Sequence, residues 1–315
     1  MSQPSPGRFD VLVLGGGPAG VSAAIYSARK GLRTGLVAER VGGQVRDIVS
    51  IETLLGTPGT DGPRLAAQFE AHLRSYPIEV LELRRVVGIE DGPWKAVLLA
   101  GGERLEARQL VVATGAQWQR LGVPGEQEHL GRGVGYCPHC DGPFYKDRPV
   151  AVVGGGEKAV KSALDLAATS SQVTLVEAGE QLGADPPLQA RLAQQPRIHV
   201  LTRARVTRIL GDGAQAQGLE YQEGDGGPLK TLAVDGIFLQ VGLVPNSAAF
   251  QGALVLNAAG ELVIDHRNRS SVSGIYGAGD VTNVPFKQVS VAVGEGAKAA
   301  LAAFEDRVRE GWAGA

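Results

Sequence analysis

Cysteine is scarce in this sequence. Of 315 residues only Cys137 and Cys140 are cysteines, and two residues separate them. A secreted scaffold held by disulfides would need more cysteines at wider spacings. A structural zinc site would need a second pair of ligands, and the five histidines show no such spacing. We therefore expect no metal, and we interpret the pair as a redox-active dithiol in a reducing compartment, the cytoplasm.

Strong net charge and long hydrophobic runs are also missing. The formal net charge is −2, and no basic block exceeds two or three residues, which argues against nucleic acid or an anionic membrane as the main partner. One uncharged run, Val11 to Ala28, has the length of a membrane span or a leader segment. Its Gly-Gly-Gly-Pro-Ala-Gly stretch would interrupt a helix, so we predict a strand, a tight turn and a helix instead.

Glycine, in contrast, is abundant. The 45 glycines are about twice the usual share, which indicates many tight turns or close backbone approaches. Two glycine clusters open two similar stretches of chain, each typical of the βαβ unit of a parallel, doubly wound sheet. In each stretch an apolar strand runs into the glycines, a helix follows, and a second strand ends on an acid: residues 9–20, 21–29 and 34–39, and again residues 150–159, 160–168 and 172–177.

The later segments repeat as well. Alternating strands follow each opening, and each copy closes on another apolar strand: residues 79–100 and 109–115 in the first copy, and residues 198–232 and 236–242 in the second. The end of the chain opens no third copy. It predicts two short strands and a closing helix, at residues 261–264, 275–276 and about 289–310.

These repeats predict an α/β fold with two Rossmann-like dinucleotide-binding domains, each with a small β-meander. The first domain is discontinuous, formed by residues 1–117 and 246–315, and the second is inserted as residues 118–245 with the cysteine pair. A chain of 315 residues has the length of about two domains. Hinges are expected near residues 117–121 and 244–246.

The first glycine motif is Gly15-x-Gly17-x-x-Gly20. Its first glycine makes a tight turn, its second lets the backbone approach a pyrophosphate, and its third lets the helix pack closely on the strand. The pyrophosphate then lies at the helix N-terminus, where free N–H groups favour negative charge. Glu39, at the end of the next strand, is placed to accept hydrogen bonds from ribose hydroxyls. The alternative is an ordinary glycine-rich turn.

The second motif is Gly154-x-Gly156-x-x-Ala159, with alanine as an accepted third residue. Glu177 ends its second strand, and no arginine follows before Arg191. A 2′-phosphate would meet a carboxylate there, so NADH is favoured over NADPH. Glu157 places a further carboxylate beside the turn, offset by Lys158 and Lys161. The alternative is therefore a degenerate fold that binds no nucleotide.

The cysteine pair lies in the polar, turn-rich string Cys137-Pro-His-Cys-Asp141. Such a pair near dinucleotide folds is typical of thiol–disulfide exchange, in which the thiolate is the reactive species. The alternative is two inert buried thiols. Asp141 is placed to donate a proton to a departing thiolate, although Asp-Gly is also a common turn dipeptide. His139 is interpreted as a tuning or structural residue with no evident partner.

The string Gly135-Tyr-Cys-Pro-His-Cys-Asp-Gly-Pro143 resembles the active site of the flavoprotein component of bacterial alkyl hydroperoxide reductase. That flavoprotein is a relative of the low-molecular-weight thioredoxin reductases. The similarity runs from about Phe9 to Arg309. It includes further short motifs at residues 39–44, 112–115, 242–246, 277–280, 287–288 and 294–297.

This resemblance implies a cofactor for each domain. The residues expected around FAD are Gly15, Gly17, Pro18, Gly20, Glu39, Gly43, Gln44, Thr53, Thr114, Gly115, Gly279, Asp280, Lys287 and Gln288. Those expected around NADH are Gly154, Gly156, Ala159, Glu177 and Gly242. The resemblance also implies that Cys140 lies against the flavin, that Cys137 faces the exchange partner and that Asp141 is the acid. The family usually forms homodimers and rotates its nucleotide domain.

Three departures from the family pattern bear on function. The alkyl hydroperoxide reductase flavoprotein carries N-terminal thioredoxin-like units, whereas this sequence begins almost at the first strand. We therefore expect the acceptor to be a separate thioredoxin- or glutaredoxin-like protein. Thr53 stands where relatives usually have an asparagine near the flavin. Gly156-Glu-Lys-Ala-Val-Lys161 replaces the usual residues after the second glycine cluster.

The expected activity is an FAD-dependent disulfide reductase that passes electrons from NADH through flavin and the Cys137–Cys140 disulfide to the acceptor. One alternative keeps the disulfide chemistry and takes electrons from a ferredoxin-like protein. Another is a flavin-binding redox sensor with little turnover. A third is a plain NADH oxidase that forms peroxide.

Overall fold

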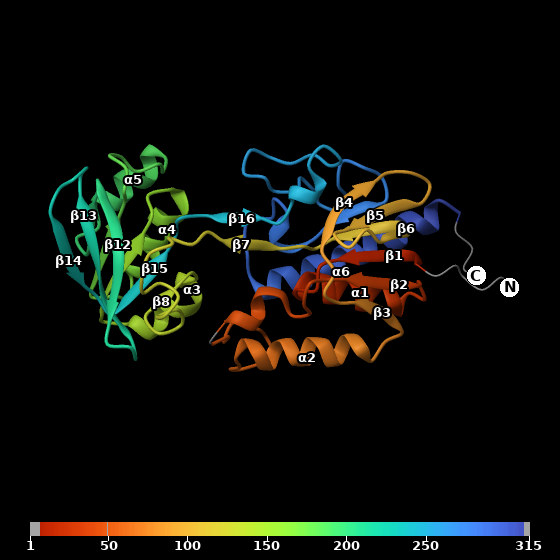
Figure 1. Ribbon diagram of the computed structural model, residues 1–315, viewed down its shortest axis with the longest axis horizontal. Helices are drawn as coiled ribbons and strands as arrows, with labels where there is room; N and C mark the ends of the chain where they lie inside the picture. Colours follow the sequence, from red (N-terminus) through yellow and green to blue (C-terminus); the bar gives the residue numbers. More distant parts are fainter. Residues whose placement is uncertain (1–6, 49, 312–315) are drawn as a thin grey trace. The chain divides into compact units, whose positions relative to one another are not determined.

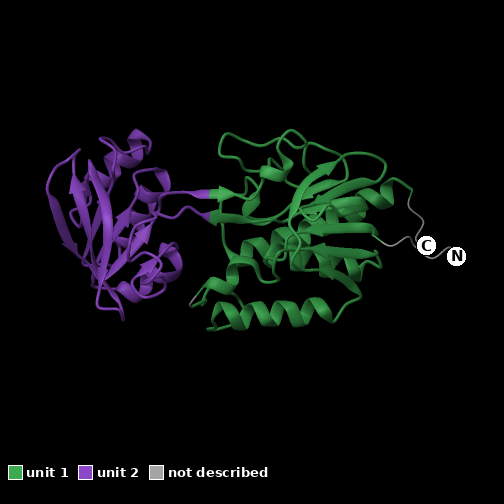
Figure 2. Cartoon of the chain, viewed as in Figure 1, with its two compact units in different colours: residues 1–117, 244–315 green, residues 118–243 purple. Residues whose placement is uncertain are grey.

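The structure, a computed structural model, describes residues 7–48 and 50–311. The chain divides into two compact units, shown in different colours in Figure 2. Unit 1 comprises Met1–Gln117 and Val244–Ala315, and unit 2 comprises Trp118–Leu243. The second boundary thus falls two residues earlier than the sequence indicated. Where the chain crosses between the units, β7 (Ala116–Trp118) pairs with β16 (Leu243–Pro245) in a two-stranded sheet.

Unit 1 is built on a seven-stranded sheet, in which six strands have the order β3-β2-β1-β6-β5-β4 (Figure 1). The seventh strand, β17, also pairs with β6. The strands of this sheet are β1 (Arg8–Leu14), β2 (Thr34–Val37), β3 (Ile78–Leu81), β4 (Val86–Glu90), β5 (Lys95–Leu99), β6 (Arg104–Val112) and β17 (Ile275–Gly277). Two different strands pair along one edge of the long strand β6. β5 pairs antiparallel with its beginning, and β17 pairs parallel with its end. The C-terminal segment therefore completes a sheet that the N-terminal segment begins.

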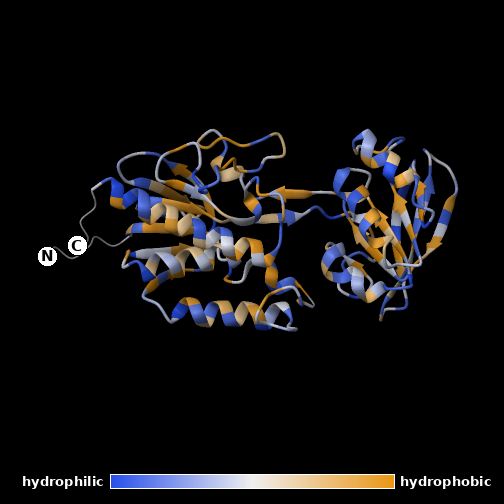
Figure 3. Cartoon of the chain, turned by 180° about the vertical axis from the view of Figure 1, so that it is seen from behind, coloured by the Kyte–Doolittle hydropathy of each residue, from blue (hydrophilic) through white to orange (hydrophobic). Residues whose placement is uncertain are grey.

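Helices cover the sheet of unit 1. They are α1 (Pro18–Arg29), α2 (Gly62–Arg74) and α6 (Val289–Arg309). The central strand β1 is buried on both faces, since Val11, Leu12 and Val13 are each 0% exposed. One core cluster joins α1 and α6 to this sheet, and a second fills the opposite face. In Figure 3 the strands are mostly hydrophobic in colour, whereas α2 alternates with hydrophilic residues, as a surface helix should.

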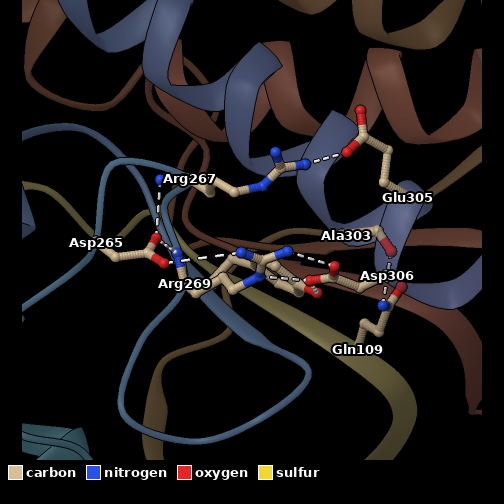
Figure 4. Close-up of polar contacts among 8 residues, drawn as sticks. Gln109, Asp265, Arg267, Arg269, Ala303, Glu305 and Asp306 are labelled. Atoms are coloured by element: carbon tan, nitrogen blue, oxygen red, sulfur yellow. Dashed lines mark hydrogen bonds and ion pairs between the residues drawn. The ribbon is translucent and has the colours of Figure 1, made fainter. Parts of the chain in front are cut away.

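A group of polar contacts fixes α6 to the rest of unit 1 (Figure 4). The Arg269 guanidinium donates two hydrogen bonds to Asp306 on α6, at 2.7 and 2.5 Å. Tyr276 donates to the same carboxylate at 2.8 Å. The Asp306 pKa is lowered mainly by the Arg269 hydrogen bond. On the buried side, Gln109 of β6 donates to the Ala303 carbonyl at 2.8 Å.

Unit 2 contains a five-stranded parallel sheet of order β11-β10-β9-β15-β8 and a separate three-stranded antiparallel sheet of order β12-β13-β14. The parallel strands are β8 (Val134–Gly135), β9 (Pro149–Val153), β10 (Gln172–Val176), β11 (Ile198–Leu201) and β15 (Gly236–Leu239). The antiparallel strands are β12 (Ala204–Gly211), β13 (Ala216–Glu223) and β14 (Leu229–Ala233). Its helices are α3 (Pro138–Asp141), α4 (Glu157–Leu166) and α5 (Pro186–Ala193).

The predicted fold class is confirmed, with three corrections of detail. β3 and β11, which the sequence assigned to the meanders, are parallel edge strands of the main sheets. Both edge strands keep exposed positions between partly buried ends, one in β3 and two in β11, so neither has the continuous apolar pattern of a central strand. No strand forms at residues 261–264. There Leu262 makes single bridges to Leu256 and Thr282, so no ladder can extend. The helices α2 and α5 were not expected.

Across residues 7–48 and 50–311, the structure contains no helix that is both long enough and apolar enough to cross a membrane.

Two glycines of α6 test how closely the helices of unit 1 approach. A Cβ atom at Gly296 would lie 2.0 Å from the Ala19 carbonyl oxygen of α1, whereas one at Gly294 would meet nothing within 4 Å. We expect Gly296→Ala to lower the free energy of unfolding by about 1–3 kcal/mol. Gly294→Ala should raise it by roughly 0.5–1 kcal/mol, because alanine favours helix. Urea unfolding followed by circular dichroism measures both, and equal effects would contradict the close approach.

Candidate redox and dinucleotide sites

The first glycine turn joins β1 to α1. Gly15 has φ +119°, and a Cβ atom there would lie 2.2 Å from the Ala113 carbonyl oxygen. At Gly20 it would lie 1.9 Å from the Gly15 carbonyl oxygen. These two glycines are therefore required by the fold. At Gly17, by contrast, the backbone is extended (φ −74°, ψ −176°) and a Cβ atom would meet nothing within 4 Å. The space beside Gly17, at the N-terminus of α1, is what a pyrophosphate needs.

The second turn, between β9 and α4, has the same construction. Gly154 has φ +129°, and a Cβ atom there would lie 2.5 Å from the Gln240 carbonyl oxygen. Gly156 again has an extended backbone (φ −73°, ψ 175°) and open space where its side chain would be. Ala159 is fully buried at the third position. Both turns thus offer a cradle that an added Cβ atom would fill.

Glu39, two residues beyond the end of β2, is held by Arg85, which no local sequence pattern indicates. Arg85 donates two hydrogen bonds to the Glu39 carboxylate, both at 2.9 Å. The Arg85 hydrogen bond lowers the pKa of Glu39, so the carboxylate stays ionised. A carboxylate has about four acceptor positions, so two remain for the hydroxyls of a ribose.

The corresponding acid of unit 2 is Glu177, which turns back over its glycine turn. One of its carboxylate oxygens accepts from the Gly179 backbone N–H at 2.6 Å. The other would lie 2.2 Å from a Cβ atom at Gly155. The carboxylate therefore lies directly against the turn, where a ribose bound at Gly156 would be expected.

The carboxylate of Glu157, which the sequence places beside the second turn, has a counter-ion. Glu157 is the first residue of α4, and its carboxylate lies 2.5 Å from the Lys161 ammonium one turn later. The pKa of Glu157 is lowered, first by the Lys161 hydrogen bond. Because this pair is neutral overall, it removes much of the repulsion toward a pyrophosphate.

Several other FAD candidates gather around the first turn. A Cβ atom at Gly43 would lie 3.1 Å from the Gly17 Cα, and one at Gly279 would lie 2.9 Å from the Ala19 Cβ. Gln44 donates to the Ala116 carbonyl. Asp280 lies in the short 3-10 helix Gly279–Val281. Segments far apart in the sequence therefore meet at one end of the unit 1 sheet.

The strand end at Thr114 is closed by Asn246. The Thr114 hydroxyl donates to the Asn246 carbonyl at 2.7 Å, and the Asn246 side chain donates to the Thr114 carbonyl at 2.8 Å. The Asn246 backbone N–H donates to Gly115 at 2.9 Å. This reciprocal bonding fixes Thr114 and Gly115 at the point where the chain leaves unit 1 and returns to it.

The start of α6 brings in the last FAD candidates. Gln288 is its N-cap residue, and the Ser290 hydroxyl donates to the Thr53 carbonyl at 3.2 Å. Lys287 is nearly buried and donates to the Thr282 carbonyl at 2.5 Å, and its ammonium lies 3.0 Å from the Glu261 carboxylate. The Lys287 charge is thus engaged within unit 1.

Cys137 and Cys140 form a disulfide with Cα atoms 5.3 Å apart. Cys137 caps the short helix α3, and its carbonyl accepts the backbone N–H groups of Cys140 at 3.1 Å and Asp141 at 3.0 Å. Both cysteines are partly exposed, which a disulfide that exchanges with another protein requires. The inert, buried alternative is therefore not what the structure shows.

Asp141 lies beside this disulfide in a largely buried position. Burial raises the pKa of its carboxyl group to about 6. A side chain at Gly135 would collide with it, since a Cβ atom there would lie 2.6 Å from an Asp141 carboxylate oxygen. The absence of a side chain at residue 135 therefore makes room for the acid. A carboxyl group with this pKa can hold and release a proton near neutral pH.

His139 has a partner, contrary to the expectation from the sequence. Its Nδ1 atom lies 2.9 Å from an Asp165 carboxylate oxygen on α4. Both side chains are exposed, so the contact ties the disulfide loop to α4 at the surface. Asp165 and Arg85 have no local sequence signal, because each meets its partner only through the tertiary fold.

Known proteins resemble this chain over most of its length. Residues 9–296 match the family described as pyridine nucleotide-disulphide oxidoreductase. The F subunit of alkyl hydroperoxide reductase is 48% identical over 304 residues in Pseudomonas putida and 43% identical over 305 residues in Escherichia coli. A Bacillus subtilis protein named NADH dehydrogenase is 44% identical over 301 residues. Each comparison covers 96% of this chain but only 58–59% of the relative.

Solved structures agree. Thioredoxin reductase from Streptococcus pyogenes superimposes with a TM-score of 0.91 at 32% identity, covering 98% of this chain and 100% of that one. Thioredoxin reductase from Giardia duodenalis also gives 0.91, at 28% identity, covering 95% and 98%. The resemblance noted in the sequence is confirmed. With two glycine turns, a partly exposed disulfide and these relatives, the chain belongs to the pyridine nucleotide-disulphide oxidoreductase family.

Proposed function

We propose that the chain is an FAD-dependent disulfide reductase that passes electrons from NADH to a thioredoxin- or glutaredoxin-like protein. The observation that carries this proposal is the partly exposed Cys137–Cys140 disulfide beside a carboxyl group whose pKa is raised to about 6. Family membership implies FAD and a pyridine nucleotide. The chain spans about 58% of its alkyl hydroperoxide reductase relatives, so the activity of those whole proteins is used only as support.

We assign FAD to unit 1 and the nicotinamide nucleotide to unit 2. The open space at Gly17, the ionised Glu39 and the convergence of Gly43 and Gly279 support the first assignment. The open space at Gly156 and the position of Glu177 support the second. Glu177 favours NADH, because a carboxylate against the turn would repel the 2′-phosphate of NADPH.

The residues of this chain carry the final transfer. When bound, FAD would take a hydride from the nicotinamide and deliver two electrons to the disulfide. The Sγ–Sγ bond breaks as the electrons arrive, and two protons complete the two thiols. In the family arrangement, Cys140 faces the flavin, Cys137 faces the acceptor, and Asp141 protonates the departing thiolate.

The acceptor is reduced by exchange. The Cys137 thiolate attacks the acceptor disulfide and forms a mixed disulfide, which Cys140 resolves by restoring the Cys137–Cys140 bond. The acceptor leaves with both electrons as a dithiol. The names of the relatives, which refer to alkyl hydroperoxide and thioredoxin reductases, support an acceptor of this class. We further propose that the protein is a homodimer and works in the cytoplasm.

Anaerobic titration tests the donor. NADH should bleach the flavin absorbance at micromolar concentrations, and NADPH should need at least about tenfold more, because the 2′-phosphate meets Glu177.

Cys140→Ser should still bleach but should fail to reduce a thioredoxin- or glutaredoxin-like acceptor. If neither nucleotide bleaches the flavin while a reduced ferredoxin does, the proposal that NADH is the electron donor is wrong. If only oxygen is ever reduced, the protein is an oxidase.

The pKa of Asp141 predicts a pH dependence. The protonated acid is present below about pH 6 and is lost as the pH rises above that value. Acceptor reduction by the wild type should therefore slow above this pH. Asp141→Asn should be about a hundredfold slower and insensitive to pH in this range. Asp147→Asn, an exposed aspartate of the same unit, is the matched control. A wild-type rate that does not change with pH would argue against Asp141 as the acid.

The two open glycines predict separate effects on the two cofactors. Gly156→Ala adds one methyl group in the path of the nicotinamide pyrophosphate and should raise the KM for NADH about tenfold with FAD content unchanged. Gly17→Ala should lower FAD content instead. Because neither methyl group meets a protein atom, unfolding of the FAD-free chain should change by less than about 0.5 kcal/mol. Equal effects of both substitutions on both cofactors would overturn the assignment.

A further inference from the structure

A buried carboxylate near the disulfide is unused by the proposed reaction. Glu126 is 4% exposed. It accepts hydrogen bonds from the backbone N–H groups of Leu121 at 3.2 Å and Gly122 at 2.6 Å, and from the Tyr136 hydroxyl at 2.8 Å. Burying a carboxylate is costly unless donors satisfy it, and packing alone would be served as well by an apolar side chain. The three donors hold the Glu126 carboxylate in one position, and we therefore ask what this fixed carboxylate holds in turn.

Tyr136 is the residue that Glu126 holds, and it directly precedes Cys137. Its ring stacks on Trp118, with ring centroids 5.8 Å apart and planes 6° from parallel. Burial, reinforced by the Glu126 hydrogen bond, raises the pKa of Tyr136 well above its usual range, so the hydroxyl keeps the proton that it donates. The side chain of Tyr136 is thus fixed at both its ring face and its hydroxyl.

The backbone of Tyr136 is fixed as well. Its carbonyl accepts a hydrogen bond from the Gln240 side chain at 2.8 Å. The Gln240 backbone carbonyl is the group that excludes a side chain at Gly154 in the second glycine turn. Gln240 also accepts from Ser162 of α4 at 3.4 Å. The same residue therefore contacts the nucleotide turn and the chain next to Cys137.

Cys137 is consequently held from both sides. On its C-terminal side its carbonyl is bonded to α3, and on its N-terminal side Tyr136 is held by Glu126, Trp118 and Gln240. Trp118, Leu121 and Gly122 belong to the segment that enters unit 2 from unit 1. A change in the bonding of Cys137 can therefore affect this segment through the Tyr136 side chain.

We propose that Tyr136 is a positioning residue for Cys137, held by Glu126, and that it links opening of the disulfide to the Trp118–Gly122 segment. This role rests on the proposed disulfide reductase function. In the oxidised chain the Tyr136 network fixes Cys137 in the disulfide. On reduction the Sγ–Sγ bond breaks, the constraint between Cys137 and Cys140 is lost, and the stacking of Tyr136 on Trp118 changes.

The first test uses Trp118 as a reporter in the FAD-containing protein with Trp94→Phe and Trp312→Phe. Dithiothreitol, which gives up two electrons and two protons and becomes a cyclic disulfide, reduces Cys137–Cys140. We expect the Trp118 emission to change by at least about a fifth in intensity, because disulfide opening alters its stacking. The same protein with Cys137→Ser and Cys140→Ser should show no response to dithiothreitol. An unchanged Trp118 emission on reduction would overturn the link to the segment.

The second test measures the reactivity of the reduced pair with an aromatic disulfide reagent. Tyr136→Phe removes only the hydroxyl and should slow the reaction about tenfold, while flavin reduction by NADH stays at the wild-type rate. Glu126→Gln keeps an oxygen that accepts from Tyr136 and should stay within about threefold of the wild type, whereas Glu126→Leu should match Tyr136→Phe. Tyr221→Phe, in β13 of the same unit, is the control and should have no effect.

The outcomes separate this role from the function on which it rests. If dithiothreitol generates no thiols that react, the disulfide reductase function itself fails. If reactive thiols form but Tyr136→Phe and Glu126→Leu react at the wild-type rate, the function stands and the positioning role is wrong. If Glu126→Gln slowed the reaction as much as Glu126→Leu, the role would also be contradicted, because the hydrogen bond to Tyr136 would then not be its basis.

Discussion

The close approach of strand, turn and helix at the glycine clusters is the constraint on which the molecule depends. Gly15 and Gly20 allow carbonyl oxygens to lie where a Cβ atom would be, and Gly154 does the same in unit 2. This approach aims the N-termini of α1 and α4 at open space beside Gly17 and Gly156. The helix N-terminus supplies free N–H groups there, and the acids at the ends of β2 and β10 lie nearby. One local geometry, used twice, gives the chain two helix N-termini with open space beside them, and these are the positions proposed for the two pyrophosphates.

Burial and charge then divide the carboxylates into different roles. Glu39, paired with Arg85, has a lowered pKa and stays ionised. Asp141 has a pKa raised to about 6, because burial disfavours its charged form. Glu126 is more deeply buried and is surrounded by three donors. The roles proposed for them, a ribose acceptor, a proton donor and a fixed anchor for Tyr136, thus rest on the same functional group in three environments.

Much of the fold could be predicted from sequence because its signals are local. The glycine spacing, the apolar runs of β1 and β9, and the paired cysteines each lie within a short stretch. Helix α2, which was not predicted, also has a local signal, since Asp61 caps it by accepting from the Arg64 N–H at 2.8 Å and Pro63 follows. The contacts of Arg85 with Glu39, 46 residues apart, have no such signal. The same holds for His139 with Asp165, which only the packing of α3 near α4 brings together.

The division of the β6 edge has a consequence for how the chain folds during synthesis. Unit 2 is continuous, Trp118–Leu243, and holds all the residues of its two sheets when Leu243 has emerged from the ribosome. Unit 1 must wait for β17 to cover the end of β6 and for α6 to cover α1. Domains generally fold as their sequences are completed. We therefore expect the inserted unit to fold first, with its two chain ends paired through β7 and β16, before the later half of unit 1 packs on the earlier half.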